Sequence, residues 1–259
     1  FNSRNIHRKR VSDLILGYAK FCETLPAAQA QKCLLVLHTD PVDQHGTDLP
    51  ALAEALCPYP VAFSHKKLSP EDLNLLYNFA DVVACPSSAE GFGLSHMEAV
   101  MSGTPTIATV VGGLQDQMGF KIMEYGEVRE LLVEDFTPET PSNSTGKISK
   151  EAGEWTYPLW PQINLQGSPL TPYIYDSRPN IQSITDGLKY WYDMDKKERK
   201  NRGLIGREWA IKNGFTNKQM CIEFSNSIDT CFNNFEPRGR YTIIDSDTPK
   251  PKYDTGILI

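Results

Sequence analysis

The sequence lacks a long hydrophobic run and an excess of positive charge. No apolar stretch approaches the ~20 residues that a membrane-spanning helix needs, and the basic N-terminal residues are not followed by a signal-peptide core. Lys and Arg number 26 against 32 Asp and Glu, and the resulting net charge of −6 opposes binding to a nucleic-acid backbone. We expect a soluble, cytoplasmic protein with no membrane span and no nucleic-acid partner.

The cysteines form no CxxC pair, and no histidine stands at metal-ligand spacing from them. They lie far apart and mostly inside apolar runs. This distribution predicts buried thiols in a reducing compartment rather than a zinc site. The residues concerned are Cys22, Cys33, Cys57, Cys85, Cys221 and Cys231.

Helix-like and strand-like segments alternate from residue 11 onward. Apolar residues at 11, 14, 15, 18 and 21 have the spacing of a helix with one buried stripe. Short apolar runs predict strands within 33–38, 61–63, 81–87 and 104–110. The helices expected between them span 48–57, 69–80, where Ser69 is the N-cap, and 97–103, which Gly103 ends. This order predicts an α/β fold, a Rossmann-like parallel sheet with helices on both faces.

The regular pattern stops at residue 114. Residues 114–180 show no long period, so we expect an ordered excursion, with a hairpin at GEWTYPLWPQ, before helices resume at 181–194, 196–213 and 217–232. We predict one domain over 1–235 and a C-terminal tail over 236–259. The excursion holds several aromatic residues, which suit either a small satellite core, the favoured interpretation, or a platform for stacking sugars. They are Trp155, Tyr157, Trp160, Tyr173 and Tyr175.

The segment EGFGLSHMEAVMSGTP, residues 90–105, carries the strongest chemical signal. Glu90 follows the predicted strand at 81–87, at the sheet edge where open parallel sheets bind ligands. Gly91 and Gly93 permit a left-handed backbone and close approach of a ligand, and the N–H groups of a helix starting near Ser95 suit an anion. Glu90 and Glu98 would then flank a bound phosphate without contacting it. This arrangement suits a nucleotide-sugar, which carries hydroxyls on both sides of its diphosphate.

Simpler explanations exist for parts of this motif. Ser95 and Glu98 have the spacing of a capping box, which would explain Glu98 without a ligand. His96 is expected to face solvent on the first helical turn rather than a ligand. A lone G-x-G is a weak signal, and the absence of a third glycine and of a later acidic residue disfavours a dinucleotide-dependent oxidoreductase.

The longer stretch ADVVACPSSAEGFGLSHMEAVMSGTPTIATVVGG, residues 80–113, resembles the donor-binding half of retaining glycosyltransferases of the GT-B type with an E-x7-E motif. The resemblance extends more weakly over 1–113 and about 183–235. It implies the C-terminal half of a GT-B fold and a nucleoside-diphosphate sugar as donor. The excursion at 114–180 exceeds the short connection common in that family.

The resemblance also implies roles for residues of the motif. Glu90 corresponds to the first glutamate, placed near the transferred sugar, and Glu98 to the second, which accepts hydrogen bonds from the ribose. The loop that faces sugar and diphosphate with its backbone N–H groups corresponds to Gly91, Phe92, Gly93 and Leu94.

The cations that neutralise the diphosphate come, by the same resemblance, from the segment SRNIHRKR. Arg4 and Lys9 match its Arg and Lys, while the family's glycine after the lysine is Arg10 here, which leaves the choice among Arg8, Lys9 and Arg10 open. A solvated basic face is the alternative for this cluster. The strand-loop that receives the base corresponds to Ser64 through Lys67, with Ser64 and Lys66 as weaker binding residues.

A cationic loop and a helix N-terminus can stabilise a departing diphosphate, so we expect no metal ion or other cofactor. Two Asp-x-Asp spellings, at Asp193 and Asp195 and at Asp245 and Asp247, are interpreted as solvated surface.

The acceptor domain of a GT-B enzyme, which precedes the donor half, is absent from this sequence. The first residue is Phe1, so we expect a fragment whose missing half lies in cis or on a separate chain. The function predicted is sugar transfer from a nucleotide-sugar to an unidentified acceptor, with retention of the anomeric configuration. The alternative is a nucleotide-sugar binding module without transferase activity.

Overall fold

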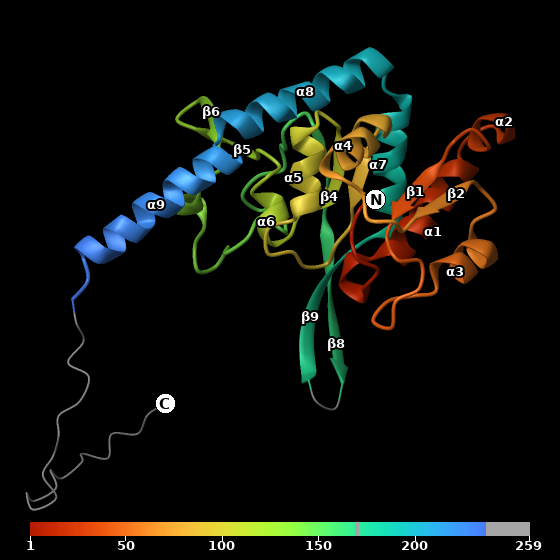
Figure 1. The fold of residues 1–259 in the computed structure, drawn as a ribbon, viewed down its shortest axis with the longest axis horizontal. Helices are drawn as coiled ribbons and strands as arrows, with labels where there is room; N and C mark the ends of the chain where they lie inside the picture. The colour runs from red at the N-terminus through yellow and green to blue at the C-terminus, as the bar shows by residue number, and fades with distance from the viewer. Residues whose placement is uncertain (169–170, 237–259) are drawn as a thin grey trace, which may run out of the picture. The chain divides into compact units, whose positions relative to one another are not determined.

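The computed structural model describes residues 1–168 and 171–236, and the chain divides into two compact units (Figure 1). The first unit is Phe1–Thr216 and the second begins at Asn217, whereas the sequence predicts a single domain to residue 235. In the second unit the described helix is α9 (Asn217–Asn233), where Cys221 and Cys231 are exposed. The expectation of buried thiols is therefore wrong for these two cysteines, although Cys22, Cys57 and Cys85 are buried.

All four strands predicted before residue 111 are present. They are β1 (Leu35–His38), β2 (Val61–Ser64), β3 (Val83–Cys85) and β4 (Thr106–Thr109). β1 pairs with β2, and β3 pairs with β4, in parallel register. The parallel α/β fold expected from the alternation is confirmed.

Among the described residues β1 and β2 form one sheet and β3 and β4 belong to another, and helices cover both faces of the sheet that contains β3 and β4. Side chains of β3 and β4 alternate between two apolar clusters: Ala84 and Ile107 enter one, while Val83, Cys85 and Ala108 enter the other. Residues of α1, α3 and α7 complete the first cluster, and residues of α4, α5 and α6 complete the second. The helices of the first unit are α1 (Val11–Glu23), α2 (Ala27–Ala30), α3 (Leu49–Leu56), α4 (Pro70–Phe79), α5 (Leu94–Met101), α6 (Gly112–Gln115), α7 (Ile181–Asp193) and α8 (Lys196–Lys212).

The helix ends follow the predicted signals. The Ser69 hydroxyl accepts a hydrogen bond from the Asp72 N–H at 3.1 Å and caps α4. Gly103, with φ of 74°, follows the end of α5. Asp195 accepts from two N–H groups and caps α8, and Asp193 pairs with Lys189, so both acidic groups have structural partners. Asp245 and Asp247 lie outside the described residues.

The excursion contains regular elements, but the segment expected to form a hairpin, GEWTYPLWPQ, differs from the prediction. Instead of forming a hairpin, β7 (Thr156–Leu159) pairs in parallel with β4 and extends the sheet to β3-β4-β7. Its two end residues, Thr156 and Leu159, are buried, but Pro158 within the strand and Pro161 after it obscure this pattern in the sequence. The remaining elements are β5 (Lys121–Glu124), β6 (Glu127–Glu130), η2 (Val133–Asp135), β8 (Pro161–Ser168) and β9 (Thr171–Pro179), with β5 and β6, and β8 and β9, forming antiparallel hairpins.

The five aromatic residues singled out in the excursion do not form one cluster, and Tyr157 and Trp160 pack against the two main apolar clusters. Trp155 is buried in a small cluster with Met97, Val100 and Ala210, as the satellite-core interpretation predicts. Tyr173 and Tyr175 are instead exposed on β9, whose hairpin with β8 extends away from the sheet (Figure 1).

Candidate functional site

A cationic loop docks against the segment that follows β3. The 3-10 helix η1 (His7–Lys9) forms this loop. The Ser88 N–H donates to the Arg8 carbonyl at 2.7 Å, and Arg8 Nη1 donates to the Ala89 carbonyl at 2.7 Å. Lys9 Nζ donates to Glu90 Oε1. Residues eighty positions apart are thus held side by side at the carboxyl end of β3.

Glu90 is the acidic centre of this contact. Its side chain is 9% exposed, and Arg8 Nη1 lies 3.1 Å from its second oxygen, Oε2. Burial acts to raise the pKa of Glu90, but hydrogen bonds from Lys9 and Ser87 and the Lys9 charge outweigh it and hold that pKa below its ordinary value. Glu90 is therefore ionised at neutral pH and is accompanied by two cations.

The glycines let two backbone segments touch. Gly93 has φ of 93° and precedes α5, whereas Gly91 is outside the left-handed region, so that part of the sequence prediction is wrong. The Gly113 N–H donates to the Glu90 carbonyl at 3.2 Å, and a Cβ at Gly113 would lie 2.3 Å from the Gly91 carbonyl oxygen. A Cβ at Gly112 would lie 2.0 Å from the Glu90 carbonyl oxygen. The paired glycines at 112–113 thus support the loop that holds Glu90.

Glu98 is held by a tyrosine that the sequence analysis missed. The Tyr77 hydroxyl donates to Glu98 Oε2 at 2.7 Å and accepts from Asn2 Nδ2 at 2.7 Å. Burial raises the pKa of Tyr77, which keeps the hydroxyl protonated and able to donate. Tyr77 lies on α4 and resembles an ordinary core aromatic in the sequence, so no local signal marks it.

The capping box is not formed. Helix α5 begins at Leu94 with Gly93 as its N-cap, and no side chain in the described residues hydrogen-bonds to that helix end. The first N–H groups of a helix have no partner within it, so this end is available to an anion. The alternative explanation of Glu98 as a capping residue is therefore wrong.

His96 is buried in the core rather than exposed to solvent, which corrects the prediction. Its Nδ1 donates to Gln117 Oε1 at 2.9 Å, and its Nε2 lies 3.0 Å from the Thr106 hydroxyl. Gln117 Nε2 in turn donates to the Phe92 carbonyl at 2.6 Å. Burial lowers the pKa of His96 to about 4, so the ring is neutral and supports the loop through Gln117.

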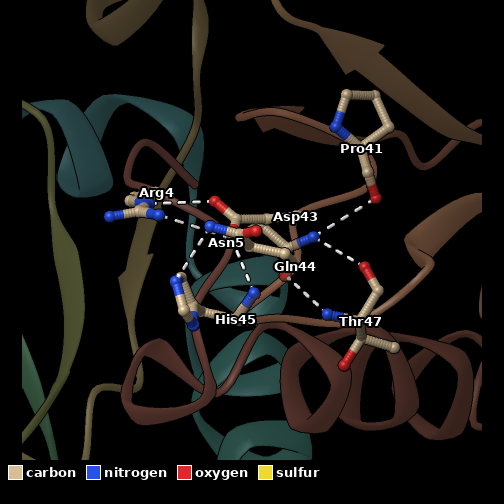
Figure 2. A network of polar contacts seen from close by, with 7 residues as sticks. All are labelled: Arg4, Asn5, Pro41, Asp43, Gln44, His45 and Thr47. Atoms are coloured by element: carbon tan, nitrogen blue, oxygen red, sulfur yellow. Dashed lines mark hydrogen bonds and ion pairs between the residues drawn. The ribbon is translucent and has the colours of Figure 1, made fainter.

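Arg4 is engaged away from Glu90. Its Nε donates to Asp43 Oδ2 at 2.9 Å, in a network that ties residues 4–5 to the loop after β1 (Figure 2). Within this network Asn5 Nδ2 donates to the carbonyls of Pro41 and Thr47 at 3.2 and 2.7 Å. In the structure Arg8, rather than Arg4, is the second cation at Glu90.

The remaining predicted residues lie on the surface or at a strand end. Phe92 is 44% exposed and contacts the Phe215 ring, with centroids 6.2 Å apart, and Leu94 is 68% exposed. Ser64 ends β2, and its hydroxyl lies 2.9 Å from His38 Nδ1. Lys66 is exposed beyond it.

A cavity of about 490 Å³ lies elsewhere, between β1 and β3, with Leu14, Leu35 and Trp191 in its walls. Neither Lys9 nor Glu90 lines it. Within residues 1–168 and 171–236, no group of three or more His, Cys, Asp or Glu is arranged to hold a metal ion. No helix in the same part of the chain has the length and apolar character to cross a membrane.

Sequence comparisons agree with the resemblance. Residues 2–121 match the family model of glycosyl transferases group 1. A D-inositol 3-phosphate glycosyltransferase of Salinispora tropica is 40% identical over 83 residues, which cover 32% of this chain and 16% of that protein. One of Corynebacterium urealyticum is 54% identical over 50 residues, covering 19% and 12% respectively.

Comparison with solved structures shows the same fold. Sucrose-phosphate synthase from Thermosynechococcus elongatus aligns with a TM-score of 0.54 and 19% identity, covering 89% of this chain and 45% of that one. A glycosyltransferase from Rickettsia africae aligns with a TM-score of 0.52 and 16% identity, covering 90% and 47%. The chain thus spans less than half the length of these relatives and has the fold of one half of a GT-B protein. Residues 2–121, which carry Lys9, Glu90 and Glu98, are similar to the glycosyl transferases of group 1.

Proposed function

We propose that this chain is the donor-binding half of a glycosyltransferase that transfers a sugar from a nucleoside-diphosphate sugar to an acceptor. The observation that carries the proposal is the contact of Arg8 and Lys9 with Glu90 beside the uncapped start of α5. Two cations and free helical N–H groups at one sheet edge suit a diphosphate, and Glu90 and Glu98 suit the hydroxyls on its two sides.

The chemistry requires stabilisation of two charges. When the anomeric C–O bond breaks, the diphosphate gains negative charge and the sugar develops oxocarbenium character. Lys9, Arg8 and the α5 N-terminus stabilise the first charge, and the Glu90 carboxylate lies on the sugar side. We propose that these groups act without a metal ion and, by resemblance to the family, with retention of anomeric configuration. The acceptor is held by a further domain, in cis or on another chain.

A calorimetric titration tests the donor site. UDP, GDP and ADP, and one sugar conjugate of each, are added to the chain with and without chelator. We expect one nucleotide series to bind selectively and with the same affinity in chelator. Binding that disappears in chelator would overturn the metal-free site, and absence of binding in every series would overturn the donor site itself.

The competing function is a binding module without transfer activity. The same donor site would serve this binding module, which differs from the transferase only in what the acceptor half supplies. Joining the chain to an acceptor-binding half and measuring release of nucleoside diphosphate separates the two: transfer supports the enzyme, and binding without transfer supports the module.

Glu98→Gln is expected to weaken nucleotide binding by about 1–3 kcal/mol, because a ribose hydroxyl would lose a charged hydrogen-bond acceptor. Tyr77→Phe should have a smaller effect in the same direction, since the tyrosine hydroxyl donates to Glu98 at 2.7 Å and orients it. Both are measured by titration with the nucleoside diphosphate and with its deoxyribose analogue. Equal losses of affinity for the two ligands would contradict a ribose contact.

A further inference from the structure

The residue after Lys9 has an unusual backbone. Arg10 has φ of 55°, in the left-handed region that favours glycine. Its side chain is only 15% exposed. The Arg10 Nε atom is buried and has no hydrogen-bond partner among the described residues. The left-handed backbone is strained for an arginine, and burial of its Nε without a partner costs solvation free energy. A compensating contact is therefore needed to hold the side chain there.

That contact comes from the β8–β9 hairpin. Arg10 Nη2 donates to Asp176 Oδ2 on β9, 166 positions later in the chain. Two residues further along β9, Arg178 donates from Nε and Nη2 to the carboxylate of Asp13 at 2.8 and 2.5 Å. Asp13 is buried on α1. These four residues, which we name the clasp, join the base of the hairpin to the start of α1.

The clasp sits directly beside the cationic loop. Arg10 follows η1, whose Lys9 contacts Glu90, and the Arg10 N–H donates to the His7 carbonyl at 3.2 Å. Holding the Arg10 side chain therefore fixes the end of the turn that carries Arg8 and Lys9. The left-handed Arg10 and the β8–β9 hairpin are thus two parts of one arrangement.

We infer that Arg10 and Asp176 are positioning residues, through which the β8–β9 hairpin holds Arg8 and Lys9 in place for the diphosphate of the donor. The inference rests on the proposed donor site, and it assigns part of that site's affinity to the hairpin. Neither residue needs to touch the ligand. The hairpin acts by restricting the loop before the ligand arrives.

Asp176→Asn tests this inference in the intact chain. The affinity of this variant for the nucleoside diphosphate is expected to fall by about tenfold, which is near the lower end of the effect of losing one charge-assisted hydrogen bond. Its affinity for the nucleoside, which lacks the diphosphate, is expected to stay unchanged. Hydrogen exchange of the amides of residues 4–10 is expected to accelerate, with the core amides of β3 and β4 unaffected. Asp176→Glu keeps the charge and is expected to restore most of the affinity.

Asp193→Asn is the matched control, because it removes an equivalent carboxylate from the exposed pair with Lys189. It should change neither affinity nor exchange at residues 4–10. Arg10→Gly is a second variant, which removes the backbone strain and the clasp together; it should accelerate the same amides. Unchanged exchange at residues 4–10 in both Asp176→Asn and Arg10→Gly would overturn the inference. A wild-type chain that binds no nucleotide would overturn the donor site alone, because the exchange measurement still tests the clasp.

Discussion

Lowering the pH from 6.5 to about 4 is expected to reduce the free energy of unfolding by about 3 kcal/mol through His96 alone. Burial lowers the pKa of His96 from 6.5 to about 4 in the folded chain, whereas the unfolded chain keeps the ordinary value. Between these two pKa values the unfolded state binds more protons than the folded state. Stability is therefore fully present above pH 6.5 and is lost as the pH falls toward 4.

Urea unfolding at a series of pH values measures this loss. His96→Gln should flatten the dependence on pH in that window, because glutamine keeps polar atoms near Gln117 and Thr106 but does not titrate. His65→Gln is the control, since His65 is exposed after β2 and its replacement should leave the slope as in the wild type. A slope that persists unchanged in His96→Gln would show that other groups cause it.

Lys9→Met is expected to weaken binding of the nucleoside diphosphate by about 10- to 100-fold, the size of loss typical of a hydrogen bond between charged partners. The methionine preserves the apolar stem, and the Lys9 side chain is only 11% exposed, so water replaces the lost charge poorly. The same change should raise the pKa of Glu90, because Lys9 supplies both a hydrogen bond and a favourable charge to that carboxylate. Calorimetric titration measures the first effect, and the pH dependence of binding measures the second.

Arg8→Met and Arg4→Met provide the comparison. Arg8 touches Glu90 but is 46% exposed, so its loss should cost less than that of Lys9. Arg4 pairs with Asp43 in the structure and is expected to have the smallest effect of the three. A larger loss for Arg4→Met than for Lys9→Met would show that the donor draws Arg4 away from Asp43 and would overturn this order.

The sequence predicts the central fold well because local signals and burial agree there. The apolar runs at β1 to β4 and the Ser69 cap are each determined by a few adjacent residues. β7 was missed because Pro158 within it and Pro161 after it favour a turn, while its pairing with β4 depends on residues far away in the chain.

The candidate site also combines features that adjacent residues determine with features that depend on contacts between distant segments. The motif marks Glu90 and Glu98 as candidate site residues through their spacing and neighbouring glycines. It does not identify Tyr77, Gln117 or the buried position of His96, because these roles arise from contacts between separate elements. Arg8 and Lys9 both contact Glu90, whereas Arg10 contacts Asp176, and no local pattern could make this distinction.

The contact between the Glu90 loop and Gly113 determines which positions of the loop can accept a larger side chain. A methyl group at Gly113 would meet backbone atoms at 2.3 Å, whereas one at Gly91 would meet no described heavy atom within 4 Å. One side of the loop is thus closed to new side chains, and the other side is open. In the proposed donor site, preference for a different sugar can therefore evolve through position 91 and the exposed neighbours Phe92 and Leu94, while the frame that fixes Glu90 stays constant.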